Sequence, residues 1–133
     1  IIEHLIDRMK ACKNADEVIL CTSTHPDDAE LVPFAEKKGI SVFTGDPADV
    51  MKRFLDAIHG KNFDIVVRVT GDNPLTSPEF IDAAIEKHIQ NGVDYTSTVE
   101  LPRGTKGEII SVSALQRAFD LAEDSSYSEY MTW

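Results

Sequence analysis

The chain has 133 residues, 42% of them hydrophobic, which is enough for one hydrophobic core of ordinary domain size. Its formal charge of −10 argues against broad binding to nucleic acids or anionic membranes, because those partners require clustered Lys and Arg. No apolar run approaches the roughly 20 residues that span a bilayer, and we interpret the two cysteines, Cys12 and Cys21, as small core residues. We therefore expect a single domain over residues 1–133, in the cytoplasm.

Short apolar runs alternate with amphipathic segments along the chain. Apolar positions spaced three and four apart predict helices, whereas apolar runs too brief for a helix predict buried strands. In chain order we expect a helix over 2–14, a strand over 17–22, a helix over 26–38, a strand over 40–43, a helix over 48–59, a strand over 63–69, a helix over 78–90, strands over 93–97 and 108–112, and a helix from its N-cap Ser113 to Leu121. This alternation predicts β-α-β units, and hence an α/β fold with a mostly parallel sheet.

Two predicted strands end in polar loops, and open α/β sheets bind their ligands beyond the carboxyl ends of the strands. The first loop holds Thr22, Ser23 and Thr24, whose hydroxyls and amides suit a base or a ribose. The alternative is that they are ordinary strand-end caps. In the second loop Asp72 closely follows a buried strand and lies beside Gly71, so its carboxylate suits Mg²⁺ bound to phosphate. Here the alternative is an aspartate in a tight turn that accepts backbone amides.

The stretch VVRVTGDNPL, residues 66–75, resembles the central motif of the cytidylyltransferase family that activates acidic sugars, especially its spore-coat polysaccharide branch. Three further stretches agree with that family in order and spacing. They are residues 21–24, the glycine turn of residues 43–46 with residues 49–54 of the following helix, and Pro102-Arg103-Gly104 with Glu108. The resemblance covers nearly the whole chain.

This resemblance implies a three-layer, Rossmann-like fold of the nucleotide-diphospho-sugar transferase type. It also implies transfer of CMP from CTP to a hydroxyl of an acidic sugar acceptor, with release of pyrophosphate, for surface polysaccharide biosynthesis. Related enzymes commonly form homodimers through elements late in their sequence. The aromatic residues Tyr127, Tyr130 and Trp133 would promote association if they were exposed. The site residues that the resemblance implies are Asp72 and Arg68 as catalytic residues, Asp72 also as the Mg²⁺ ligand, and Thr22, Ser23, Thr24, Asn73, Arg103 and Glu108 as nucleotide- or sugar-binding residues. For Arg68 and Arg103, a solvated position or a structural ion pair remains the alternative.

The chain departs from the family pattern in two places. The family opens with a strand and a loop rich in Arg, Ser, Gly and Lys that holds the triphosphate, whereas this chain starts at the following helix. We therefore expect a truncated domain, inactive by itself, whose sheet lacks its first strand. A partner chain, a swapped segment or direct pairing of strands 17–22 and 63–69 would fill the gap. In addition, Lys106 occupies the position of a family Asp, so one carboxylate near the metal is missing.

Two other functions remain open. Lys106 and the missing loop suit a degenerate, non-catalytic binding or assembly domain of the same fold. A related glycosyltransferase is the third possibility, although that class usually carries two aspartates one residue apart, and Asp72 is followed by Asn73. The four histidines have no metal-binding spacing, and we expect them at the surface.

Overall fold

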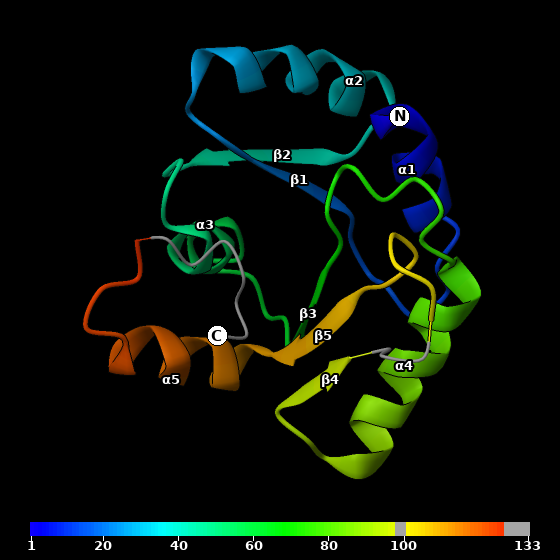
Figure 1. The fold of residues 1–133 in the computed structure, drawn as a ribbon, viewed down its shortest axis with the longest axis vertical. Helices are drawn as coiled ribbons and strands as arrows, with labels where there is room; N and C mark the ends of the chain where they lie inside the picture. The colour runs from blue at the N-terminus through cyan, green and yellow to red at the C-terminus, as the bar shows by residue number, and fades with distance from the viewer. Residues whose placement is uncertain (98–100, 127–133) are drawn as a thin grey trace. The chain divides into compact units, whose positions relative to one another are not determined.

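The computed structural model describes residues 1–97 and 101–126 (Figure 1). Tyr127, Tyr130 and Trp133 lie outside these described residues. The chain divides into two compact units, each assembled from two separate segments. The first unit comprises Ile1–Val18 and Ile65–Ser111, and the second comprises Ile19–Asp64 together with the chain from Val112 onward. No helix in the described ranges has the length and apolar content that crossing a membrane requires.

A three-stranded antiparallel sheet with a helix against it forms the first unit (Figure 1). The strand order is β3-β5-β4, so β5 is central. Helix α4 packs its apolar side on the sheet, where Ile81, Ala84 and Ile85 form a buried cluster with Ile109 of β5. The elements of this unit are α1 (Ile2–Met9), β3 (Ile65–Arg68), α4 (Pro78–Asn91), β4 (Tyr95–Ser97) and β5 (Glu108–Ser111).

Both ends of α4 carry residues that commonly cap helices. Ser77 is the N-cap and accepts a hydrogen bond from the amide of Phe80 at 3.4 Å, with Pro78 at the first helical position. Gly92 ends the helix in the left-handed region, at φ 58° and ψ 37°. The predicted helix over 78–90 is therefore confirmed to within one residue.

Helix α1 ends at Met9, earlier than the predicted end near Asn14. The carboxylate of Asp82, on α4, accepts hydrogen bonds from the backbone amides of Lys13 and Asn14 at 3.0 Å. The side-chain amide of Asn14 also donates to the carbonyl oxygen of Asp82 at 3.2 Å and to Glu86 at 3.1 Å. Because these tertiary bonds satisfy amides that a longer helix would use, the chain leaves the helix early.

The second unit is built on a parallel pair of strands, in which Ile19 lies opposite Ser41 and Ser23 opposite Gly45. Helix α3 begins at the N-cap Asp49, whose Oδ1 accepts from the amide of Lys52 at 2.9 Å. The other oxygen of Asp49 accepts from Ser125, which ties the residues after α5 to the start of α3. The elements are β1 (Ile19–Ser23), the 3-10 helix η1 (Pro26–Leu31), α2 (Val32–Lys37), β2 (Ser41–Gly45), α3 (Val50–Ala57) and α5 (Val112–Leu121).

The single helix expected over 26–38 was wrong, because η1 and α2 replace it. Pro33 has no amide to donate and lies at the start of α2, where a missing donor is tolerated. In α2, Phe34 is 40% exposed, whereas Ala35 is buried. Ser113 lies inside α5 instead of capping it, since the helix already begins at Val112.

Strand pairing differs from the expected mostly parallel sheet. Among the described residues one pairing is parallel, β1 with β2, and two are antiparallel, β3 with β5 and β4 with β5. In the part of the chain that the structure describes, β1 and β3 belong to different sheets, so direct pairing of these two strands is not observed.

His88 is buried, which corrects the expectation that all four histidines lie at the surface. It is 2% exposed on the sheet-facing side of α4. Its Nδ1 lies 3.0 Å from Thr96 Oγ1, on β4, and its Nε2 lies 3.0 Å from Ser111 Oγ, on β5. Ser111 Oγ in turn donates to the carbonyl oxygen of Val93 at 3.2 Å. His88 therefore links α4 to both of these strands by hydrogen bonds.

Replacing His88 by alanine should lower the free energy of unfolding by about 2–4 kcal/mol, because it leaves a cavity and removes the hydrogen bonds of His88 to Thr96 and Ser111, of which Ser111 keeps its bond to Val93. Urea denaturation measures this change. Lys87→Ala, at an exposed neighbouring position of α4, is the control and should change the unfolding free energy by less than about 0.5 kcal/mol. Equal effects of the two substitutions would contradict the structural role of His88.

Candidate functional site

Asp72 lies at the tip of the loop between β3 and α4. The turn is closed by Asn73, whose backbone amide donates to the carbonyl oxygen of Thr70 at 3.1 Å and whose side-chain Nδ2 donates to Thr70 Oγ1 at 2.5 Å. The carboxylate of Asp72 is exposed and has no hydrogen bond or ion pair within the described ranges. The alternative of an aspartate that accepts backbone amides in its own turn is therefore not what the structure shows.

Thr76 closes the same loop from inside the first unit. It is completely buried, and both its backbone amide and its hydroxyl donate to the carbonyl oxygen of Asn73, at 3.2 and 3.0 Å. The next residue, Ser77, is the N-cap of α4. The backbone that carries Asp72 is thus fixed on both sides, while the Asp72 side chain remains available to a ligand.

The loop before β5 approaches the Asp72 loop closely, and two glycines permit this approach. A Cβ at Gly104, where φ is 80°, would lie 3.5 Å from Asn73 Oδ1. A Cβ at Gly107 would overlap Ile81 Cδ1 and lie 3.5 Å from the carbonyl oxygen of Arg68. Arg103 is exposed on this loop, next to Gly104. The structure therefore brings the loops of Asp72 and Arg103, both predicted site residues, side by side.

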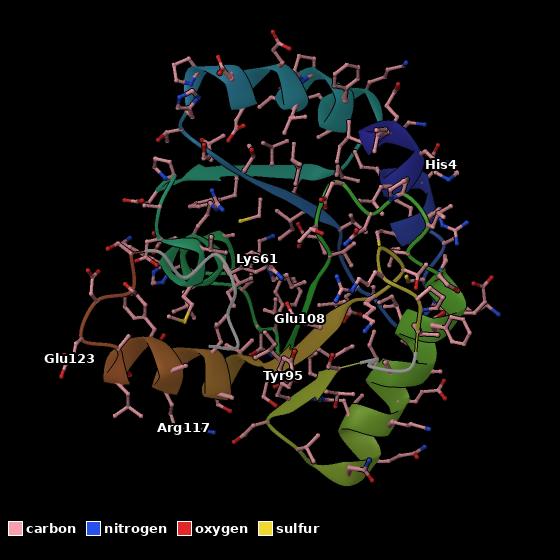
Figure 2. The ribbon with its side chains drawn as sticks, viewed as in Figure 1. His4, Lys61, Tyr95, Glu108, Arg117 and Glu123 are labelled. Atoms are coloured by element: carbon pink, nitrogen blue, oxygen red, sulfur yellow. The ribbon has the colours of Figure 1, made fainter. Side chains whose placement is uncertain are left out.

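Arg68 and Glu108 face each other across β3 and β5 and form an ion pair. They are register partners, with 2.6 Å between Arg68 Nη1 and Glu108 Oε2, and their side chains are only 14% and 19% exposed. The other carboxylate oxygen, Oε1, accepts a hydrogen bond from the hydroxyl of Tyr95 on β4 at 2.8 Å (Figure 2). The structural ion pair, which was the alternative for Arg68, is thus present, and both oxygens of Glu108 are engaged.

The residues near Asp72 fit a Mg²⁺ ion whose other ligands are waters and the phosphates of a bound nucleotide. Among the described residues, no group of three His, Cys, Asp or Glu side chains could hold a metal ion. Mg²⁺ is commonly held by one or two carboxylates, several waters and the phosphates of its nucleotide. Asp72, with its free carboxylate, fits as the single protein ligand of such an ion. Lys106 contributes no second carboxylate.

Thr22, Ser23 and Thr24 belong to the second unit, at the end of β1. Thr22 and Ser23 are buried, at 7% and 5% exposure. The hydroxyl of Ser23 donates to Asp28 and accepts from the amide of His25 at 3.0 Å, and the Thr24 amide donates to the carbonyl oxygen of Gly45 at 2.8 Å. Ser23 thus acts as a strand-end cap, which was the alternative to a role in nucleotide binding.

Tyr95 and Thr76 were missed by the sequence analysis. Tyr95 on β4 bonds Glu108 on the neighbouring strand β5, two residues from its register partner Ile110. This contact follows from the β4–β5 register and not from local sequence. Thr76 lies directly before Ser77, and only its complete burial distinguishes it.

The sequence profile described as cytidylyltransferase matches residues 1–132. The chain belongs to the cytidylyltransferase family. It is 36% identical over 132 residues to MJ1063 of Methanocaldococcus jannaschii, covering 99% of this chain and 54% of that protein. It is 32% identical over 137 residues to the spore coat polysaccharide biosynthesis protein SpsF of Bacillus subtilis, covering 99% of this chain and 57% of SpsF.

A cytidylyltransferase structure from Leptospira borgpetersenii is similar in fold, with a TM-score of 0.86 and 28% identity. The match covers 93% of this chain and 54% of that one. This likeness confirms the Rossmann-like α/β class of the cytidylyltransferases. The chain spans about half the length of these relatives.

A double-mutant cycle should measure a coupling of about 1–3 kcal/mol between Arg68 and Glu108, because removing either partner leaves a largely buried charge. The measurement is the unfolding free energy of Arg68→Ala, Glu108→Ala and the double variant. The exposed pair Lys52–Asp56, one turn apart on α3, is the control and should couple more weakly. Equal coupling in the two cycles would contradict the assignment.

Both cysteines should react slowly with thiol reagents in the folded protein. Burial raises the pKa of each thiol from 9.0 to about 11; the nearby carboxylates of Asp82 and Glu79 add to this at Cys12, whereas Arg53 opposes it at Cys21. A shift of this size leaves about a hundredfold less thiolate at pH 8. The measurement is the rate at which the two thiols react with an aromatic disulfide reagent at pH 8, with the urea-unfolded chain as the control. Equal rates in the two states would contradict the burial of these thiols.

Proposed function

We propose that the whole protein, rather than residues 1–133 by themselves, transfers CMP from CTP to an acidic sugar, with Mg²⁺ bound at Asp72, in the biosynthesis of a surface polysaccharide. The observation that carries the proposal is the carboxylate of Asp72, exposed and without a partner in the described ranges, on a backbone fixed by Thr70, Asn73 and Thr76. Membership of the cytidylyltransferase family supplies the nucleotide and the reaction class.

In this reaction the sugar hydroxyl attacks the α-phosphorus of CTP, and the bond from that phosphorus to the departing pyrophosphate oxygen breaks. Mg²⁺ would neutralise charge that builds on the phosphate oxygens. The contribution of the chain is orientation: Asp72 would hold the metal that binds the phosphates, and the exposed guanidinium of Arg103 on the neighbouring loop can pair with a phosphate or with the sugar carboxylate. Arg68 holds Glu108 and keeps the start of the Asp72 loop in register.

The acceptor and setting rest on the relatives. SpsF is named for spore coat polysaccharide biosynthesis, which supports a surface polysaccharide as the destination of the activated sugar. An acidic sugar is consistent with Arg103, because a guanidinium binds a carboxylate with two parallel hydrogen bonds. A homodimer in the cytoplasm, where CTP is available, completes the proposal.

Lys106 favours a second candidate, a domain of the same fold that binds the nucleotide without transferring it. It lies on the loop before β5, where the family pattern has an Asp. A cation in this position can hold phosphate but cannot ligate Mg²⁺. The two candidates are separated by an assay for transfer of radiolabelled CMP from CTP to a panel of acidic sugars. Only the transferase forms a labelled CMP-sugar and releases pyrophosphate.

Asp72→Asn should remove the Mg²⁺-dependent part of CTP binding, because a neutral amide is a far weaker ligand for a hard divalent cation. Calorimetry with and without Mg²⁺ should give at least a tenfold loss of affinity with Mg²⁺, about 1.4 kcal/mol, and little change without it. Asp16→Asn, at an exposed position of the same unit, is the matched control and should bind as the unchanged protein does. Identical binding curves for Asp72→Asn and the unchanged protein would exclude Asp72 as the metal ligand.

A further inference from the structure

Helix α1 contacts the Asp72 loop at two points, although the two segments lie far apart in the sequence. Near its C-terminal end, Arg8 Nε donates a partly buried hydrogen bond to the carbonyl oxygen of Thr76 at 2.7 Å. Near its N-terminal end, Ile2 lies against Gly71, where an added Cβ would be 3.6 Å from Ile2 Cδ1. The helix therefore spans both ends of the loop that carries Asp72.

Thr76 connects Arg8 to the turn of Asp72. It is completely buried, and its amide and hydroxyl both hold the carbonyl oxygen of Asn73. Arg8 satisfies the remaining polar group, the carbonyl oxygen of Thr76, with a charge-assisted bond, which is stronger than a bond between neutral groups. A continuous set of hydrogen bonds thus runs from Arg8 through Thr76 to the residue that follows Asp72.

Asp72 depends on this backbone for its position. Its own side chain has no partner in the described ranges, so the loop backbone is what holds the Asp72 Cα and Cβ in place. Arg8 also carries charge next to the start of α4: after the larger effects of hydrogen bonds from Ser77 and the backbone, it helps to lower the pKa of Glu79.

We propose that Arg8 is a positioning residue for the metal site, which holds the Asp72 loop in its binding conformation through the carbonyl oxygen of Thr76. This inference rests on the proposed function, in that Asp72 is taken to be the metal ligand. The role of α1 is then to stabilise the conformation of the Asp72 loop. Without the Arg8 bond, the loop would spend more of its time in conformations that place Asp72 away from the metal.

The test combines amide hydrogen exchange in the absence of metal with Mn²⁺ binding in the presence of CTP, followed by water proton relaxation. In Arg8→Gln the amides of Asn73 and Thr76 should exchange about tenfold faster, and Mn²⁺ affinity should fall about tenfold, as expected from the loss of one charge-assisted hydrogen bond. Arg8→Lys, which keeps a charged donor, should recover part of both effects.

Asn14→Ala is the matched control. It also removes side-chain bonds between this end of the chain and α4, to Asp82 and Glu86, but it does not touch the Asp72 loop. Its exchange rates at Asn73 and Thr76, and its Mn²⁺ affinity, should remain those of the unchanged protein. If Asn14→Ala and Arg8→Gln change these quantities equally, α1 stabilises the unit in general and the positioning role is overturned.

Failure of this inference and failure of the proposed function give different results. Suppose that the unchanged protein binds Mn²⁺, that Asp72→Asn does not, and that Arg8→Gln binds Mn²⁺ and exchanges the Asn73 and Thr76 amides as the unchanged protein does. In that case the inference about Arg8 is wrong and Asp72 remains the metal ligand. If Asp72→Asn binds Mn²⁺ as well as the unchanged protein, the metal assignment fails. Faster exchange in Arg8→Gln would then still establish that Arg8 holds the loop, but the role toward the metal would be overturned.

Discussion

The antiparallel pairing of β5 with β3 is the constraint on which the first unit depends. Its register places Glu108 opposite Arg68, and their ion pair fixes the point where β3 ends and the Asp72 loop begins. The same register brings the preceding loop so close that Gly107 and Gly104 leave no room for larger side chains without displacing Ile81 or crowding Asn73. The carboxylate of Asp72 and the guanidinium of Arg103 therefore lie on neighbouring loops because of one strand pairing.

The local rules of sequence were sufficient for both ends of α4 and for the identity of the main loop. Ser77, Pro78 and Gly92 mark both ends of α4, because capping and left-handed termination depend on residues a few positions apart. A buried strand followed by Thr-Gly-Asp-Asn-Pro likewise identifies the Asp72 loop, and the structure places Asp72 exposed at its tip. The Mg²⁺ role of Asp72 and the nucleotide role of Thr22 to Thr24 remain predictions.

What the sequence could not supply depends on contacts between distant residues. Helix α1 stops early because Asp82, some 70 positions away, takes the amides of Lys13 and Asn14. His88 is buried because Thr96 and Ser111 provide hydroxyls for both of its ring nitrogens, and neither hydroxyl can be assigned to it from local spacing. The antiparallel direction of β5 was missed for a different reason: parallel strands need a crossover connection, usually a helix, and the predicted elements place no helix between strands 93–97 and 108–112.

The most direct test of the account is paramagnetic broadening of backbone amide signals by Mn²⁺ in the presence of CTP. We expect the signals of Gly71, Asp72 and Asn73 to broaden first, with Gly104 on the neighbouring loop, because Mn²⁺ replaces Mg²⁺ at oxygen ligands. Broadening that spares these residues and appears first at the acidic turn of Asp27 and Asp28 would contradict it, because the metal would then bind in the other unit and the Asp72 loop would have only a structural role.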